Sequence, residues 1–215
     1  YDDLGDYAKQ RELLERALRI GEREHGKDST QVAVVRTNLG NAYGALGDHA
    51  KKRDMLERAL AIEERAYGRD HPEVTTTLTN LGNAYCDLGD HAKARDMLER
   101  ALAIKERAYG RDHPEVALTL TRIGMAHYAL DDYAKQRDML ERALAIEERA
   151  YGRDHPKVAI TLFNLAMVNG DLGDNAKKRE LLERALAIKE RAYGPDHSET
   201  AGCRAVLDSI REMGA

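Results

Sequence analysis

The sequence predicts an all-α protein, an α-solenoid built of stacked antiparallel helix pairs. The first observation behind this prediction is the pentapeptide Leu-Glu-Arg-Ala-Leu, which recurs at a constant step of 42 residues. It begins at Leu14, Leu56, Leu98, Leu140 and Leu182. A fixed period between about 20 and 50 residues indicates repeated units that bury their apolar faces against their neighbours.

The second observation is a turn signal nine residues before each pentapeptide. The pairs are Gly5-Asp6, Gly47-Asp48, Gly89-Asp90, Asp131-Asp132 and Gly173-Asp174. Connections this short, about two to four residues, force successive helices to run antiparallel.

The third observation is apolar spacing at the helical period. Leu78, Leu81, Gly82 and Tyr85 follow the i, i+3, i+4, i+7 pattern of one buried helix face. We expect Asp70 to cap the start of this helix, with a proline in the first turn and a glutamate completing a capping box. A glycine after each second helix favours a left-handed C-terminal cap.

These signals divide residues 1–215 into a single array. The expected units are a partial repeat with only the second helix at 1–27, full repeats at 28–69, 70–111, 112–153 and 154–195, and a capping helix at 196–215. Because residues 1–4 align with residues 43–46, we expect the chain to begin inside a repeat, its first full helix running from about Asp6 to His25. That helix lacks a preceding neighbour, which predicts an end-to-end contact or an upstream helix. Polar Asp208 and Arg211 favour a cap at the other end.

Composition excludes several classes of function. The 34 basic and 38 acidic residues give a net charge of only −4, unlike a nucleic-acid-binding protein. No apolar run approaches the roughly 20 residues that span a membrane. Cys86 and Cys203 suggest no disulfide framework, so we expect reduced thiols and a cytoplasmic protein.

No residue set predicts catalysis, a metal or a cofactor. His71, His113, His155 and His197 recur once per repeat, too far apart to share one ion, and are better explained as part of the helix starts. No nucleophile, base and orienting group are brought together by spacing. We therefore expect that the chain is not an enzyme and uses no cofactor.

A period near 42 also fits HEAT and armadillo arrays, and the residues decide between them. Asn-Leu-Gly-Asn-Ala-Tyr at 38–43 and 80–85, then Leu-Gly-Asp and the pentapeptide, resembles the tetratricopeptide repeat (TPR). The segment Gly-Arg-Asp-His-Pro-Glu-Val resembles its kinesin-light-chain type. The resemblance covers essentially the whole chain. It implies a right-handed superhelix with a concave groove, lined by the first helix of each pair, that binds peptides or partner proteins.

One departure from the family concerns the start of each second helix, where the family usually has a small residue. The chain has Ala94 in one repeat but Gln10, Lys52, Gln136 and Lys178 in the others. Two explanations are open: looser packing of the helix pair, or a rotated helix. In a rotated helix, neighbouring alanines would take over the contact. These are Ala50, Ala92, Ala134 and Ala176.

Helical spacing leaves a second face of each first helix free to meet a partner. The residues predicted to bind a peptide there are Asn38, Asn41, Asn80, Asn83, Arg122, Met125, Tyr128, Phe163, Asn164 and Met167. Their character changes from polar to apolar along the chain. Asparagines suit a peptide backbone, an arginine suits a carboxylate, and methionines form an adaptable apolar pocket. The alternative is that the asparagines bond a neighbouring helix within the array.

Asn41, Asn80 and Arg122 also match positions of the clamp with which some family members hold acidic C-terminal tails. Thr37 and Leu118 stand where that clamp has lysines, which weakens this interpretation. The sequence thus predicts a protein-interaction module, a scaffold or adaptor whose protein or peptide partner is unspecified. The alternatives are a structural, self-assembling array, with end-to-end contact through the N-terminal helix, or a regulatory sensor segment of a larger signalling protein.

Overall fold

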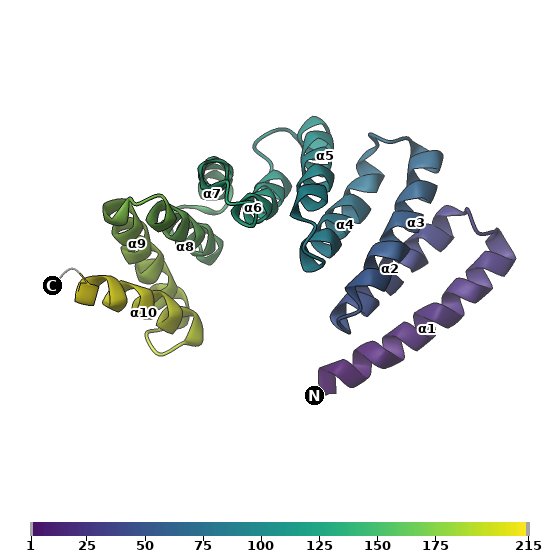
Figure 1. Cartoon of the computed structure of the whole chain (residues 1–215), viewed down its shortest axis with the longest axis horizontal. Helices are drawn as coiled ribbons and strands as arrows, with labels where there is room; N and C mark the ends of the chain where they lie inside the picture. The colour runs from purple at the N-terminus through teal and green to yellow at the C-terminus, as the bar shows by residue number, and fades with distance from the viewer. Residues whose placement is uncertain (1, 214–215) are drawn as a thin grey trace. The chain divides into compact units, whose positions relative to one another are not determined.

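The computed structural model describes the backbone of residues 2–213 and the side chains of residues 5–210, and its helices follow one another without an intervening strand in that range (Figure 1). The helices are α1 (Asp2–His25), α2 (Thr30–Ala45), α3 (His49–Tyr67), α4 (Thr75–Asp87), α5 (His91–Tyr109), α6 (Pro114–Tyr128), α7 (Tyr133–Tyr151), α8 (Pro156–Asp171), α9 (Asn175–Tyr193) and α10 (Ser198–Met213), with a 3-10 turn, η1 (Pro72–Val74), before α4.

The chain forms two compact units, unit 1 (Tyr1–Ala108) and unit 2 (Tyr109–Ala215). In unit 1, α2 packs against α1 and α3, and α3 packs against α4. In unit 2, each helix from α6 to α10 packs against the next. Short turns join the members of each pair, so neighbouring helices are antiparallel, and the predicted all-α class of stacked helix pairs is confirmed.

Each unit has its own apolar core, made from the residues that recur at the helical period. In unit 1, Leu56 of α3 packs with Leu78 and Leu81 of α4. In unit 2, Leu162 of α8 packs with Leu182 of α9, and the core continues into α10. The pentapeptide and the apolar stripe of the preceding helix therefore form one packed layer per repeat.

The helix starts differ from the prediction in one respect. The N-cap of the 3-10 turn η1, which leads into α4, is His71, not Asp70: the imidazole Nδ1 accepts a hydrogen bond from the Glu73 amide at 3.2 Å. Asp70 is one residue too early to reach that amide, and instead its carboxylate lies 3.6 Å from the Arg107 guanidinium. The same histidine cap recurs before α6 and α8, which confirms that these histidines belong to the helix starts.

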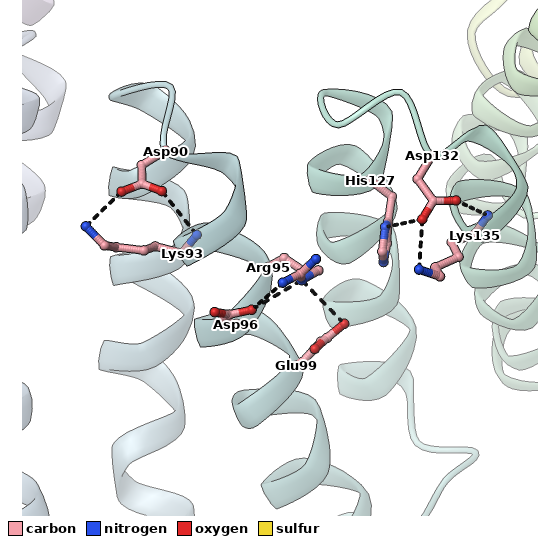
Figure 2. Close-up of polar contacts among 8 residues, drawn as sticks. All are labelled: Asp90, Lys93, Arg95, Asp96, Glu99, His127, Asp132 and Lys135. Carbon is pink, nitrogen blue, oxygen red and sulfur yellow. Dashed lines mark hydrogen bonds and ion pairs between the residues drawn. The ribbon is translucent and has the colours of Figure 1, made fainter.

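Aspartates at the predicted turns cap the second helix of each pair. The Asp132 carboxylate accepts a hydrogen bond from the Lys135 amide at 3.3 Å and lies 2.9 Å from the Lys135 ammonium (Figure 2). Asp90 and Lys93 repeat this arrangement at the start of α5. Removing such a cap typically costs about 0.5–2 kcal/mol, so the Gly-Asp signal has a stabilising role in every pair.

The predicted start of the first helix at Asp6 is wrong. Helix α1 begins at Asp2 and passes through Gly5 without a turn. At the later repeats the turn closes onto a complete preceding helix, as where the Gly47 amide donates to the Gly44 carbonyl at 3.0 Å and Gly47 adopts a φ of 81°. Gly5, in contrast, is not among the glycines with a positive φ, and helix α1 continues through it.

Unit 1 buries one carboxylate that is only partly satisfied. Glu63 of α3 is buried, and its Oε1 accepts a hydrogen bond from the Thr77 hydroxyl at 3.0 Å, whereas its Oε2 has no hydrogen-bond partner. Burial raises the pKa of Glu63 above the ordinary glutamate value, the Thr77 bond opposes the rise, and the negative charge of Glu73 adds to it.

We expect Glu63→Gln to stabilise the fold at pH 7 by about 1 kcal/mol, because it removes a buried, under-bonded charge. A raised folded-state pKa means that the native protein binds more protons than the unfolded chain, so wild-type stability falls as pH rises past 4.5. The advantage of the variant should therefore grow between pH 4 and pH 7 in urea unfolding. Glu141→Gln, at an exposed position, is the control, and an advantage that shrinks with rising pH would contradict the assignment.

Candidate functional site

Unit 2 contains a hollow of about 390 Å³ between α6 and α8, with α7 beneath it. Its lining residues are Met125, Tyr128, Gln136, Leu140, Asn164, Met167 and Asp171. Four of them were predicted from the sequence to face a partner: Met125, Tyr128, Asn164 and Met167.

Helical spacing explains how these side chains come together. Met125 and Tyr128 lie three residues apart at the end of α6, and Asn164, Met167 and Asp171 lie three and four residues apart on α8, so each set shares one helix face. Both helices place their buried leucines on the adjoining face. The exposed face is left lined by methionine and tyrosine, and the Met125 side chain is 62% exposed.

Two hydrogen-bond acceptors face this apolar lining. Gln136 is 8% exposed, and its Oε1 has no hydrogen-bond partner. Asp171 lies exposed at the end of α8, and no cation of the described residues pairs with it. Tyr133 lies nearby: its hydrogen bond to Asp131 raises the pKa of the tyrosine, and the charge of Asp171 adds a smaller effect in the same direction. The rim of the hollow is therefore acidic.

A second hollow, of about 280 Å³, lies near the starts of the same two helices. Leu118 of α6 and Ile160 of α8 supply apolar wall, and both side chains are about half exposed. Glu147 of α7 lies beneath them, and burial raises its pKa. The α6–α8 face thus offers apolar surface along much of its length.

The other predicted residues occupy different surroundings. In unit 2, Phe163 packs against the core, and the Lys189 ammonium lies 5.7 Å from its ring centre, while Arg122 is half-buried. In unit 1, Asn38 and Asn41 are exposed, and Asn80 and Asn83 are half-buried. Among the described residues, Asn38, Asn80 and Asn164 make no side-chain hydrogen bond to a neighbouring helix. Contact of these asparagines with a peptide backbone stays a prediction.

The suggestion that a rotated helix replaces the small residue is wrong. Ala50, Ala92, Ala134 and Ala176 are all exposed. The larger residues at the family's small position are instead accommodated by their neighbours. The Lys52 side chain lies against Gly44, where an added Cβ would come within 2.6 Å of its Cδ. Gln136 is accommodated in the floor of the hollow.

Sequence reasoning missed Gln136, Leu140 and Asp171 as site residues because it searched one face of the first helices only. Gln136 and Leu140 come from α7, and Asp171 comes from the last position of α8. The one sequence feature that could have indicated Gln136 as a site residue is that it stands where the family usually has a small residue.

Comparison with family models decides the relationship. The tetratricopeptide repeat model matches residues 1–65, 53–107, 73–146 and 115–190. The chain belongs to the tetratricopeptide repeat family. These matches cover most of the chain, so the resemblance drawn from the repeated hexapeptide and pentapeptide is confirmed.

Solved structures of TPR proteins share this fold. The TPR-like repeats of a candidate kinesin light chain from Podosopora anserina are 24% identical, with a TM-score of 0.80 over 89% of this chain and 91% of that one. BtubC from P. vanneervenii is 18% identical, with a TM-score of 0.76 over 97% and 82% of the two chains. YrrB, described as a TPR protein with an unusual peptide-binding site, is 20% identical, with a TM-score of 0.63 over 90% and 84%. No curated protein sequence matches the chain.

Residues 2–213 contain no helix long and apolar enough to cross a membrane. The described side chains include no group of three or more histidine, cysteine, aspartate or glutamate residues placed to hold a metal ion.

Proposed function

We propose that this TPR protein binds a segment of a partner protein on the α6–α8 face of unit 2. The observation that carries the proposal is the hollow of about 390 Å³, because four side chains predicted from the sequence to contact a partner meet in it. A concave apolar surface with a few polar groups is the usual form of a binding site. Methionine side chains suit it to a flexible segment, since they adapt to the shape of their neighbour.

The membership of the family supports the same proposal, since TPR proteins bind peptides or proteins, and one of the similar structures is titled for its peptide-binding site. A scaffold or adaptor role, the absence of enzymatic activity and a cytoplasmic location stay predictions. So does the continuation of the contact to Asn38, Asn41, Asn80, Asn83 and Arg122.

We expect Met125→Glu combined with Met167→Glu to weaken partner binding at least tenfold, because two charges replace the apolar walls of the hollow. A random peptide library displayed on phage, selected against the wild-type chain, supplies the ligands. Affinities of the selected peptides for wild type and variant are then measured by fluorescence polarisation. Circular dichroism checks that the helical content is unchanged.

Leu13→Glu is the matched control, since the Leu13 side chain is 60% exposed but lies on α1 in unit 1. It should leave peptide affinity unchanged. Selected peptides that bind the double variant as tightly as wild type would refute the proposal.

The alternative of self-association rests on α1, whose side chains Leu13 and Ile20 are largely exposed. If α1 forms an end-to-end contact, sedimentation of the wild-type chain should show concentration-dependent dimers that Leu13→Glu abolishes. A monomer at every concentration would count against the contact.

A further inference from the structure

The acidic rim of the unit 2 hollow has a counterpart in unit 1, two repeat steps earlier in the chain. Lys52, Gly44 and Asp87 stand 84 residues, twice 42, before Gln136, Tyr128 and Asp171. Each site is formed by one helix pair and the first helix of the next pair: α2, α3 and α4 in unit 1, and α6, α7 and α8 in unit 2. The residues of the two sites can therefore be compared position by position.

In unit 1 the space that corresponds to the hollow is filled by a side chain of the protein itself. The Lys52 stem lies across Gly44, and its ammonium lies 2.8 Å from the Asp87 carboxylate. The imidazole Nδ1 of His49 lies 3.3 Å from the same carboxylate, although its angle makes no hydrogen bond. An aliphatic stem and a cation thus fill this space and neutralise its acid.

In unit 2 neither of the residues that lie at the carboxylate in unit 1, Lys52 and His49, is present at the matching position. Gln136 stands in place of Lys52, so a neutral amide with an acceptor oxygen replaces the ammonium, and Tyr133 stands in place of His49. Asp171 keeps the carboxylate, but none of the described side chains forms an ion pair with it. The Lys178 side chain of α9 lies against Gly170, and among the described residues no ion pair joins it to Asp171.

The residues that line the hollow suit a side chain with an aliphatic stem and a hydrogen-bond donor. Gln136 Oε1 is a buried acceptor without a donor, and such a group destabilises the fold until a partner supplies the donor. Met125, Met167 and Tyr128 line the hollow around it, a surface suited to an aliphatic stem, and a tyrosine ring also attracts a cation.

We infer that the hollow takes an arginine side chain from a partner peptide, which does in unit 2 what Lys52 does in unit 1. Arginine fits better than lysine, since a planar guanidinium carries several donors and can reach the Asp171 carboxylate and Gln136 Oε1 together. Apolar residues on either side of the arginine would lie against the methionines. This inference rests on the proposed function and names the chemistry of its ligand.

The test uses the probe acetyl-Ala-Leu-Arg-Leu-Ala-amide and its citrulline counterpart, which keeps the shape but has no charge. Binding is followed by ¹³C-methyl NMR of the methionines, which reports directly on Met125 and Met167. We expect the arginine peptide to shift these two methyl signals and to bind at least tenfold more tightly than the citrulline peptide. An acidic peptide, with glutamate at the centre, should not bind.

Two variants locate the effect. Asp171→Asn should weaken the arginine peptide about tenfold. Gln136→Lys should do the same or more, because it removes the Gln136 acceptor and places a competing cation in the floor of the hollow. Asp87→Asn, at the matching position of unit 1, is the control and should leave the affinity unchanged.

Each outcome decides a different question. Equal binding of the arginine and citrulline peptides, or arginine binding that Gln136→Lys does not weaken, overturns the inference. If library-selected peptides bind wild type through the methionines but carry no basic residue, the inference fails and the proposed function stands. If no peptide distinguishes wild type from the methionine double variant, both fail.

Discussion

Replacing Leu162 by alanine should lower the free energy of unfolding by about 2–5 kcal/mol. Leu162 is 0% exposed and lies in the unit 2 core between α7 and α9. Truncating it loses the transfer free energy of three carbon atoms and leaves a cavity that the close-packed helices fill only in part. Urea unfolding followed by circular dichroism measures the change, and hydrogen exchange of the α8 amides locates it.

Ile160→Ala is the matched control, because it lies on the same helix and its side chain is 51% exposed. Its unfolding free energy should change by no more than about 0.5 kcal/mol. Similar losses for the two variants would mean that the buried face of α8 is assigned incorrectly.

Alanine at two equivalent glycines should have opposite effects on stability. Gly82→Ala places a Cβ 2.7 Å from Leu98 Cγ and 3.3 Å from the Ala94 carbonyl oxygen, so a fully buried leucine must move. Overpacking of this kind costs about 1–3 kcal/mol. The better helix propensity of alanine returns only about 0.5–1 kcal/mol, so the variant should be destabilised.

Gly124→Ala should stabilise the fold by about 0.5–1 kcal/mol. Its added Cβ would lie 3.5 Å from Leu140 Cγ and 3.6 Å from the Gln136 carbonyl oxygen, which is ordinary contact. Ala166 already occupies the same position in the next repeat. Thermal unfolding of both variants gives the comparison, and changes of the same sign would contradict the packing described for one of the two sites.

The fold followed from the sequence because each signal was local and repeated. The turn aspartates, the apolar stripe and the pentapeptide each act within about one helix turn, so they predict the buried faces and the starts of α3, α5, α7 and α9, though not the start of α1. The histidine cap was missed because Asp70 and His71 are adjacent and both accept hydrogen bonds. The structure shows that His71, two residues before Glu73, is the one that reaches its amide. His197 makes the same bond to the Glu199 amide with a serine between them, so the cap does not require a proline.

The candidate site was predicted only in part, and the reason is physical. Met125 and Met167 could be found because they share the free face of two equivalent helices. Phe163 was expected beside them but packs against the core, since its large ring reaches Lys189 on α9. Gln136 and Asp171 lie more than 30 residues apart in the sequence, on α7 and α8. They could not be recognised as site residues separately, because they line one hollow only in the folded structure.

A further property follows from the charged residues near the helix starts of unit 2. Lys189 of α9 binds Glu199 of α10 at 3.0 Å, whereas one repeat earlier Glu147 of α7 feels the opposite charge of Lys157 on α8. The signs are reversed between consecutive layers. An array that exchanged these two pairs would place Glu147 opposite Glu199 and Lys157 opposite Lys189. Nearly identical repeats are prone to such exchange during folding. The reversal therefore gives opposite charges in the native pairs and like charges in the exchanged ones, which disfavours the exchange.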